Sequence, residues 1–396
     1  MPGAQKALVI GGGVAGTSAA MAMRAVGLEP TIFEAHPRTA DGAGSFLTVA
    51  TNGIDALRAL GADAPVLARG FATPQIVLRS WTGKELGQGP LGVALADGTM
   101  SHTLKRTDLY SALADQAGAR GIPTEYGKRL ADAVVEGQRV RAIFADGSEA
   151  VGDILIGADG AHSAARRLID PAAPDAHYER LLTTGGYVRG VDVSAPVGGY
   201  EMIFGKSAFF GYVPAPTGEV WWFANLPDRH SPAGTERVHD EAALRDRLLT
   251  AFADDAGPAT SLIKATSDIQ PLTPIHTVPR LRAWHRGPMV ILGDAAHAPS
   301  PTSGQGASLS VEDAVALAWA IRRNSTVPEA FAAFERERRA RVEPIVRAAK
   351  RMNSSKAAGP IGRVLRDATM PTMMRMMANS KAMLKVFNHH AEPLTS

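Results

Sequence analysis

The 396-residue chain contains no cysteine. It therefore cannot form a disulfide, attach a flavin through sulfur or use a thiol in catalysis, and we expect it in a reducing cytoplasm. It also lacks any apolar run of about eighteen residues, so we expect no membrane-spanning helix. No two histidines stand four positions apart, and without cysteines the sequence offers no constellation of metal ligands.

An excess of charge of one sign is lacking as well. The 42 basic and 39 acidic residues leave a net charge of +3, which argues against a nucleic-acid partner. The densest basic stretch, residues 336–351, alternates with Glu335, Glu337 and Glu343 at helical spacing. We therefore predict a solvated helix face there rather than a phosphate-binding patch.

What the chain does contain is a glycine-rich turn close to its N-terminus. Residues 9–16 form an apolar strand that runs into Gly-x-Gly-x-x-Gly. Gly11 permits a tight strand-to-helix turn, Gly13 lets backbone N–H groups approach a pyrophosphate, and Gly16 lets the next helix pack closely on the strand. The triplet taken alone leaves open a glycine-rich loop without a ligand.

A helix, a second strand and an acidic residue complete this unit. Residues 17–25 have a helical pattern, and residues 30–33 indicate a second parallel strand that ends at Glu34. The N-terminus of the helix would face phosphates, and the Glu34 carboxylate would accept hydrogen bonds from a ribose. The unit predicts a dinucleotide site, but FAD and NAD place their ADP moiety in the same way, so it does not choose between them.

Two later motifs each place a carboxylate after an apolar strand. Residues 153–167 form a strand that ends at Asp159, followed by a basic helix. Residues 289–308 form a strand that ends at Asp294, followed by a glycine-rich loop. Open α/β sheets bind ligands at the carboxyl ends of their strands, so both carboxylates are candidate ligand contacts.

The third motif has a physical interpretation of its own. Asp294 would reach the hydroxyls of an extended ribityl chain. Glycines in the 304–306 loop would let backbone N–H groups lie against a flat ring and stabilise the negative charge of a reduced flavin. We expect a helix from about residue 309, with Ser310 and Asp313 forming its capping box. The alternative is that Asp294 only caps a helix.

In order and spacing, the three motifs resemble those of the single-component FAD-dependent aromatic hydroxylases. These flavoprotein monooxygenases include para-hydroxybenzoate hydroxylase and the tetracycline-inactivating monooxygenases, and the resemblance covers nearly the whole chain. The family often has Asn where this chain has Ser308, and adjacent prolines where this chain has Pro299 and Pro301. The resemblance implies non-covalent FAD, held at the family's motif positions: Gly11, Gly13, Val14, Ala15, Gly16, Glu34, Arg106, Asp159, Gly293, Asp294, Pro301, Gly304, Gly306, Ala307 and Ser308.

The resemblance also implies a reaction. NAD(P)H, bound transiently with the help of the Asp159 motif, would reduce FAD. Dioxygen would then form a C4a-hydroperoxyflavin that hydroxylates an aromatic or polyketide-like small molecule. The flavin would carry the chemistry, so no catalytic side chain is named. A reductase of the geranylgeranyl type and a non-catalytic FAD-fold protein remain alternatives, whereas the lysine and tryptophan motif of a flavin halogenase is not found.

We therefore expect an α/β fold with a Rossmann-like FAD-binding domain of the glutathione-reductase type. A mostly antiparallel β-sheet substrate domain would be inserted into it, and a helical tail would follow, in a monomer or homodimer. Asp97-Gly98 and Asp146-Gly147 are hairpin signals. The expected FAD-binding domain takes residues 1–70, 103–172 and 278–350, the substrate domain 71–102 and 173–277, and the C-terminal helical segment 351–396.

Aromatic residues on the predicted strands of the second sheet are the candidate substrate contacts: Tyr187, Phe204, Phe210 and Trp222. Aromatic side chains on strands usually pack a core, so both roles stay open. Trp221 and Trp222 should point to opposite faces of their strand, because side chains alternate. The methionine-rich residues 370–377 suggest either an adaptable lid over a ligand or a plain packing helix.

Overall fold

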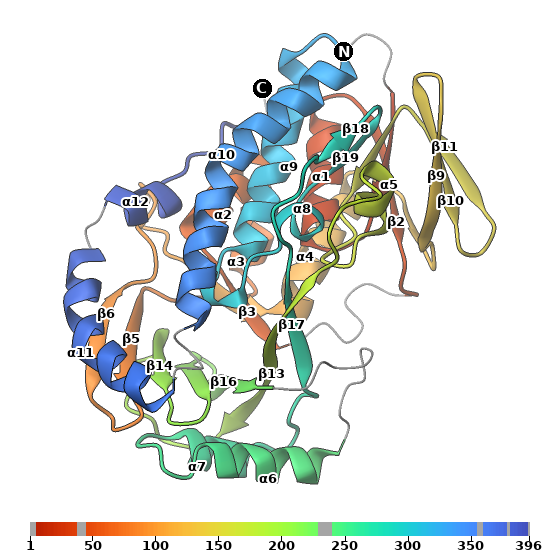
Figure 1. Cartoon of the computed structure of the whole chain (residues 1–396). Coiled ribbons are helices and arrows are strands. Elements are labelled where there is room, and N and C mark those ends of the chain that lie inside the picture. The colour runs from red at the N-terminus through yellow and green to blue at the C-terminus, as the bar shows by residue number, and fades with distance from the viewer. Residues whose placement is uncertain (1–4, 38–44, 229–239, 355–358, 378–380, 395–396) are drawn as a thin grey trace.

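The computed structural model describes residues 5–37, 45–228, 240–354, 359–377 and 381–394. A mostly parallel sheet with its helices occupies one half of the molecule, and a second large sheet occupies the other (Figure 1). The long helix α10 (Val327–Ser354) runs along the first half, and α11 (Pro360–Met377) lies beside the edge of the second sheet. The mixed α/β fold with a C-terminal helical region confirms the expected fold class.

The first sheet has six strands, of which five are mutually parallel and β18 is antiparallel at one edge. Its central strands are buried along almost their whole length, as their continuous apolar sequence requires when both faces are covered. In spatial order the strands are β18 (His285–Arg286), β19 (Met289–Ile291), β12 (Ile154–Gly157), β1 (Lys6–Ile10), β2 (Glu29–Glu34) and β8 (Thr124–Tyr126).

Helices and a small antiparallel sheet cover the two faces of the first sheet. Helix α1 (Val14–Ala25) packs against α9 (Gly306–Arg323). On the other face lies a meander of β9 (Leu130–Glu136), β10 (Arg139–Phe144) and β11 (Glu149–Gly152). The Asp146-Gly147 turn joins β10 to β11, so that hairpin prediction is confirmed.

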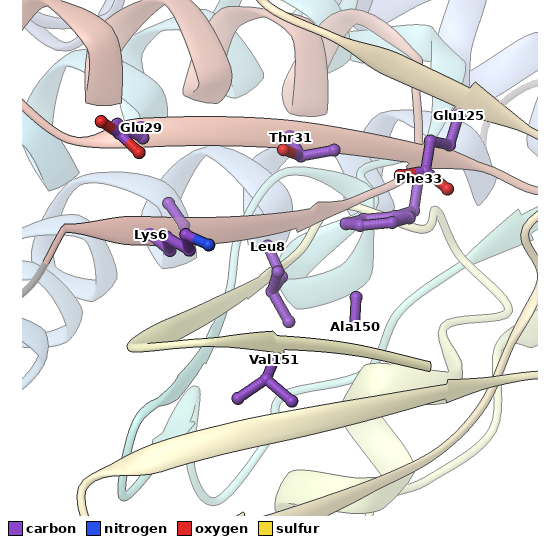
Figure 2. Close-up of a pocket in the computed structure, with 9 residues that line it drawn as sticks. Lys6, Leu8, Glu29, Thr31, Phe33, Glu125, Ala150 and Val151 are labelled. Atoms are coloured by element: carbon purple, nitrogen blue, oxygen red, sulfur yellow. The ribbon is translucent and has the colours of Figure 1, made fainter. Parts of the chain in front are cut away.

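A depression of about 200 Å³ lies between the first sheet and β11 (Figure 2). Lys6, Leu8 and Thr31 line it from β1 and β2, and Ala150 and Val151 line it from β11. None of the predicted site residues borders it.

The second large sheet has seven strands, and all its neighbouring pairs are antiparallel except β14 with β5. Helices α6 (Glu241–Ala251) and α7 (Ala259–Ala265) cover its outer face. The strand order is β17 (Thr273–Thr277), β13 (His177–Arg189), β16 (Glu219–Pro227), β15 (Phe209–Pro214), β14 (Gly199–Phe204), β5 (Gln75–Ser80) and β6 (Glu85–Pro90).

Shorter elements connect the two halves. One of them is a three-stranded sheet in the order β3, β7, β4. Its residue Phe46 packs against the inner face of the seven-stranded sheet. The remaining elements before the C-terminal helices are β3 (Phe46–Val49), α2 (Thr51–Ala59), α3 (Asp63–Leu67), β4 (Phe71–Ala72), β7 (His102–Lys105), α4 (Arg106–Ala119), α5 (Ala164–Ile169), α8 (Asp294–His297) and the 3₁₀ helix Pro301–Ser303.

Three helices end the chain: α10 (Val327–Ser354), α11 (Pro360–Met377) and α12 (Lys381–Phe387). Helix α11 packs on β6, at the edge of the seven-stranded sheet. The segment after α12 returns to α2, where the Leu394 N–H donates to the Ala59 carbonyl oxygen at 3.1 Å. Across the described ranges, no helix is both long and apolar enough to cross a bilayer.

The hairpin prediction at Asp97-Gly98 is wrong. The chain does turn there, with the Leu95 N–H donating to the Thr99 carbonyl oxygen at 2.9 Å, but no strand flanks the turn. Asp97 instead pairs with Arg58 of α2 at 2.7 Å. The turn therefore fastens a loop to a helix.

Candidate functional site

The three sequence motifs meet at the carboxyl ends of β1, β12 and β19. Gly11 follows β1 with φ +104°, and a Cβ there would lie 2.5 Å from the carbonyl oxygen of Ala158, which follows β12. Gly293 follows β19 with φ +59°, and its Cβ would lie 2.7 Å from that of Ala15 in α1. Side chains at these glycines would force the motifs apart, so glycine is needed for their close approach.

The glycines of the first motif differ in what surrounds them. A Cβ at Gly16 would collide with the carbonyl oxygen of Gly11, so close helix-to-strand packing requires this glycine. A Cβ at Gly13 would meet no atom within 4 Å, and its φ of −77° suits any residue. Folding therefore does not explain Gly13. The open space beside it, at the N-terminus of α1, fits a phosphate group.

Glu34 holds the glycine turn. One carboxylate oxygen accepts the Gly12 N–H at 2.6 Å, and the other lies 2.8 Å from the His36 backbone nitrogen and 2.7 Å from its Nδ1. The side chain is 14% exposed. A carboxylate has about four acceptor positions, so this arrangement leaves capacity for a ribose hydroxyl.

Asp159 is already engaged in holding α5. Its carboxylate accepts a hydrogen bond from the Ser163 hydroxyl and from the backbone N–H groups of Ala164 at 2.7 Å and Ala165 at 3.1 Å. Burial raises the pKa of Asp159, while these hydrogen bonds act in the opposite direction. Its contact with FAD, expected from the sequence, remains a prediction.

Arg166 links the second motif to the third. Its guanidinium is almost completely buried and donates to the carbonyl oxygens of Ala161 at 2.7 Å and Ala295 at 3.1 Å. The expected basic helix thus has a structural cation, which ties the chain after β12 to the chain after β19.

Asp294 is the first residue of α8, and its side chain is exposed. No hydrogen bond from the described part of the chain reaches its carboxylate, so it is free to accept one from a ligand. The surrounding protein displaces bulk solvent and raises the pKa of Asp294, while His297 and Arg106 act in the opposite direction. Arg106, the first residue of α4, donates to the Tyr110 hydroxyl at 3.1 Å.

The loop at residues 304–308 lies beside Asp294. A Cβ at Gly306 would lie 3.8 Å from an Asp294 carboxylate oxygen, and one at Gly304 would meet nothing within 4 Å. Helix α9 begins at Gly306 rather than at residue 309, so its N-terminal N–H groups belong to the loop itself. Pro301 is exposed in the preceding 3₁₀ helix, and Ala307 is half-buried.

Two serines near the start of α9 have partners within the protein. The Ser308 hydroxyl accepts the Ala50 N–H at 3.1 Å, so its side chain binds the chain before α2. Ser310 and Asp313 form no capping box, because the helix begins four residues before Ser310. The Ser310 hydroxyl donates to the Gly306 carbonyl oxygen at 2.8 Å, and Asp313 faces other partners.

Asp313 lies in a buried ionic network behind the loop. Its carboxylate accepts the Gly293 N–H at 2.8 Å and Arg338 Nε at 2.6 Å, and it lies 2.6 Å from His297 Nε2. Burial alone would raise the pKa of Asp313, but the charges of His297 and Arg338 lower it to about 2. The Asp313 side chain therefore fixes the turn that presents Asp294.

Glu312 forms the other half of this network. It accepts a hydrogen bond from Arg338 Nη2 at 2.9 Å and a two-bond fork from Arg341, with Nε at 2.7 Å and Nη2 at 2.6 Å. The prediction of a solvated helix face at residues 336–351 is therefore wrong for Arg338 and Arg341. Both turn inward because two adjacent buried carboxylates require compensating charge.

The site passes a simple test of fit for FAD. Gln305 heads α9 and is 2% exposed, yet its Nε2 has no partner among the described residues. Asp294 offers a free acceptor, and Gly13 and Gly304 leave open space. A long molecule with phosphates, hydroxyls and a polar ring edge would satisfy these groups together.

The inner face of the seven-stranded sheet turns toward the half of the molecule that contains the six-stranded sheet and its helices, which we call the FAD half. Tyr187 and Trp221 are cross-strand partners on this face, with ring centroids 5.3 Å apart. Phe46 of β3 packs on Trp221 at 5.5 Å and on the half-buried Phe223 at 6.1 Å. Strand alternation thus builds an aromatic wall from Phe46, Tyr187, Trp221 and Phe223, which we call the inner wall.

Phe210 and Trp222 lie on the opposite face. They stack at 5.4 Å and are fully buried beneath α6 and α7, so their predicted contact with substrate does not fit this position. Trp221 and Trp222 do point to opposite faces, as alternation predicts. Phe204 is on the inner face but packs beneath Met370 of α11.

Comparison with known proteins agrees with this geometry. A family model described as a FAD binding domain matches residues 4–349, most of the chain. This chain belongs to that FAD-binding family. A FAD-dependent urate hydroxylase from Klebsiella pneumoniae is 29% identical to this FAD-binding protein over 352 residues, which cover 87% of this chain and 89% of that one. The aurachin C monooxygenase/isomerase of Stigmatella aurantiaca is 32% identical, with 86% of each chain covered.

Solved structures extend the likeness. The FAD-binding chain matches Klebsiella pneumoniae HpxO, complexed with FAD and uric acid, with a TM-score of 0.83 at 25% identity, covering 100% of this chain and 98% of that one. A salicylate hydroxylase, at 19% identity and a TM-score of 0.77, shows the same fold. The predicted membership among FAD-dependent hydroxylases and monooxygenases is confirmed.

The sequence analysis of this FAD-binding protein missed several residues around the site. Asn52, Glu312 and Arg341 were not singled out as neighbours of the loop at residues 304–308. One signal was present, because Glu312 and Asp313 interrupt an otherwise apolar helix. Two adjacent acids in such a helix need buried cations, and the arginine-rich helix that follows supplies them.

Proposed function

We propose that this protein is a FAD-dependent, NAD(P)H-consuming monooxygenase that hydroxylates an aromatic or polyketide-like small molecule. The observation that carries the proposal is the convergence of three motifs at one sheet edge, opposite an aromatic wall on the second sheet. The relatives named above are hydroxylases and monooxygenases, which favours this function over a reductase of the geranylgeranyl type or a non-catalytic FAD-fold protein.

The proposed FAD contacts are spread along the extended cofactor. Residues of the first motif from Gly11 to Gly16 would hold the pyrophosphate at the N-terminus of α1, and Glu34 would accept the ribose hydroxyls. Asp294, with Arg106 nearby, would bind the middle of the cofactor. The remaining proposed contacts are Asp159, Gly293, Pro301 and residues 304–308.

The protein's part in the reaction is to bind, orient and exclude water. When bound, the flavin would supply reduction by NAD(P)H and activation of dioxygen at its C4a carbon. The N–H groups at the start of α9 would stabilise negative charge on the reduced ring. The inner wall would hold a planar substrate in an apolar setting that keeps water from the reactive oxygen.

The test measures NAD(P)H oxidation, oxygen uptake and hydroxylated product with the FAD-loaded protein. Phenols, aromatic polyketides and uric acid are offered singly. The proposal expects at least one aromatic compound to accelerate NAD(P)H oxidation and to gain one oxygen atom from O2. Anaerobic saturation of a double bond would identify a reductase instead. Absence of any flavin-dependent turnover across the panel would favour the non-catalytic alternative.

A further inference from the structure

The C-terminal segment, residues 384–394, binds the FAD half of the molecule. The Ala391 N–H donates to the Asp55 carboxylate at 2.7 Å, and the Glu392 carbonyl oxygen accepts Trp319 Nε1 at 2.9 Å. Together with the Leu394 contact to Ala59, these bonds fasten the segment to both α2 and α9. Helix α9 begins within the loop at residues 304–308, and the start of α2 contacts this loop through Ala50 and Asn52.

Arg341 of α10 is the point where this segment meets the buried network. Its guanidinium donates to the carbonyl oxygens of Lys385 at 3.0 Å and Val386 at 2.9 Å. The same group forms the two-bond fork with Glu312 described above. Since a guanidinium has five N–H donors in a fixed plane, the position of the segment and that of Glu312 are set by one rigid group.

Asn52 connects Glu312 to the loop at residues 304–308. Asn52 Nδ2 donates to a Glu312 carboxylate oxygen at 2.7 Å and to Gln305 Oε1 at 2.9 Å. Asn52, Gln305 and Glu312 are all at most 2% exposed. Hydrogen bonds in such a dry setting are strong, and a chain of them holds its members in register.

Gln305, the last residue in this chain of contacts, has a side-chain donor without a partner among the described residues. Gln305 Nε2 and Asn52 Oδ1 are both buried without a partner among the described residues. Gln305 immediately precedes Gly306, which lies beside Asp294. An unpaired buried donor is costly, and a ligand in the loop would remove that cost.

We propose that Arg341, Glu312, Asn52 and Gln305 are positioning residues for FAD, and that the C-terminal segment completes the FAD site through them. The inference rests on the proposed FAD contacts of the 304–308 loop. Fixing the segment to Arg341 would hold the Gln305 amide and the first N–H groups of α9 in place for the cofactor. The tail therefore serves FAD retention, apart from any role in covering substrate.

A double-mutant cycle on the dissociation constant of FAD tests the proposal. The full-length protein is stripped of FAD and titrated with it for Arg341→Met, Gln305→Ala and the double variant. Each single change should raise the dissociation constant about tenfold, the loss of roughly one hydrogen bond. Because both act through one chain of contacts, the double variant should fall well short of the product of the two effects.

Arg339→Met is the matched control. Arg339 lies on the same helix at similar exposure, 17% against 12% for Arg341, but it pairs with Glu335 and Glu343. Arg339→Met should leave the dissociation constant of FAD unchanged on its own, and it should add nothing to the effect of Gln305→Ala. Deletion of residues 385–396 should match Arg341→Met. The visible absorption spectrum of bound flavin should shift in Gln305→Ala, Arg341→Met and the deletion variant alike.

The outcomes separate this inference from the proposed function. Independent effects of Arg341→Met and Gln305→Ala, or a lowered melting temperature with an unchanged dissociation constant, would overturn the positioning role while FAD binding stands. A wild-type protein that binds no FAD would overturn the proposed function itself. If Arg341→Met does not fold, the cycle is measured with Asn52→Leu and the deletion of residues 385–396, with the same expectations.

Discussion

At the scale of single residues, the site combines groups that folding requires with groups that folding does not explain. Gly11, Gly16 and Gly293 belong to the first kind, because any Cβ would strike neighbouring atoms. Gly13 and Asp294 belong to the second kind. A Cβ at Gly13 has room, and the Asp294 carboxylate is exposed. Substitutions at these two positions should therefore separate cofactor binding from stability.

Gly13→Ala should fold normally and bind FAD poorly. Its backbone angles suit alanine, so the free energy of unfolding without FAD should change by less than about 0.5 kcal/mol. The new methyl group would occupy the space proposed for the pyrophosphate, and the dissociation constant of FAD should rise at least about tenfold. Gly118→Ala, at another open position in α4, is the control and should bind FAD normally. Unimpaired FAD binding by Gly13→Ala would place the pyrophosphate elsewhere.

Asp294→Ala should weaken FAD binding and leave the apoprotein stable. It would remove the proposed charge-assisted hydrogen bond to the cofactor, worth about 1.5–3 kcal/mol, and no core volume. Equilibrium dialysis against FAD would measure the loss. Asp254→Ala, at an exposed ion pair with Lys206, is the control. If both variants retain FAD equally well, Asp294 serves only to begin α8.

At the scale of elements, buried charges hold together the parts that surround the proposed cofactor position. Asp313 of α9 fixes the turn before α8, and Arg338 of α10 neutralises it. Such a pair is not by itself evidence of high stability, because desolvation offsets much of the attraction. Removing one partner is nevertheless costly, since the other charge remains buried. The network therefore specifies geometry more than it adds stability.

Asp313→Asn should reveal this network through its pH dependence. The folded pKa of Asp313 is about 2, below its unfolded value of 3.8. A depressed carboxyl pKa contributes stability that is fully present above pH 4 and is lost as the pH falls toward 2. The shift corresponds to about 2 kcal/mol. Urea unfolding in excess FAD should show the variant less stable at pH 6, with the gap to wild type narrowing below pH 4. A gap independent of pH would exclude this linkage.

The methionines of helix α11 differ widely in their exposure to solvent. Met370 is 7% exposed against Phe204 and Phe209, whereas Met376 is 74% exposed. Met370→Ala should cost about 2–4 kcal/mol of stability, and Met376→Ala should cost less than about 0.5 kcal/mol. If α11 also closes the substrate region, Met370→Ala should release hydrogen peroxide in place of product. If Met370→Ala converts NAD(P)H into product without releasing hydrogen peroxide, α11 is a packing helix and does not close the substrate region.

At the scale of the whole molecule, two sheets that bury separate cores face each other. The FAD half supplies the cofactor loops, and the seven-stranded sheet supplies the aromatic inner wall. The tail touches both halves, since α11 packs on β6 and the C-terminal segment binds α2 and α9. Its two parts therefore need separate tests, because a long truncation would remove both contacts.

The purified protein should be yellow, with FAD as its only flavin. Since the chain has no cysteine, attachment through sulfur is excluded, and heat or acid denaturation should release all of the flavin into solution. Ultrafiltration followed by chromatography of the filtrate would measure it. Flavin retained by the precipitated chain would contradict non-covalent binding, and a colourless protein that cannot be reconstituted would contradict the cofactor assignment.

The sequence by itself determined the motifs and the elements that carry them. Gly-x-Gly-x-x-Gly after a buried strand, Asp-Gly after a second and Gly-Asp after a third are local patterns, and each lies where its strand ends. Strand alternation likewise separated Trp221 from Trp222 correctly. Local rules suffice for such features because backbone geometry and side-chain direction depend on neighbouring residues.

Only the tertiary structure decided which faces and charges meet. Alternation could not say that Trp222 faces α6 and α7 while Trp221 faces the FAD half, because that depends on what packs on each side. Helical spacing made Arg338 and Arg341 look solvated, yet Arg338 is buried and Arg341 is half-buried, because both pair with acids of the preceding helix α9. Contacts between distant segments, such as Arg341 with Val386 and Asn52 with Gln305, arise from packing and leave no local pattern in the sequence.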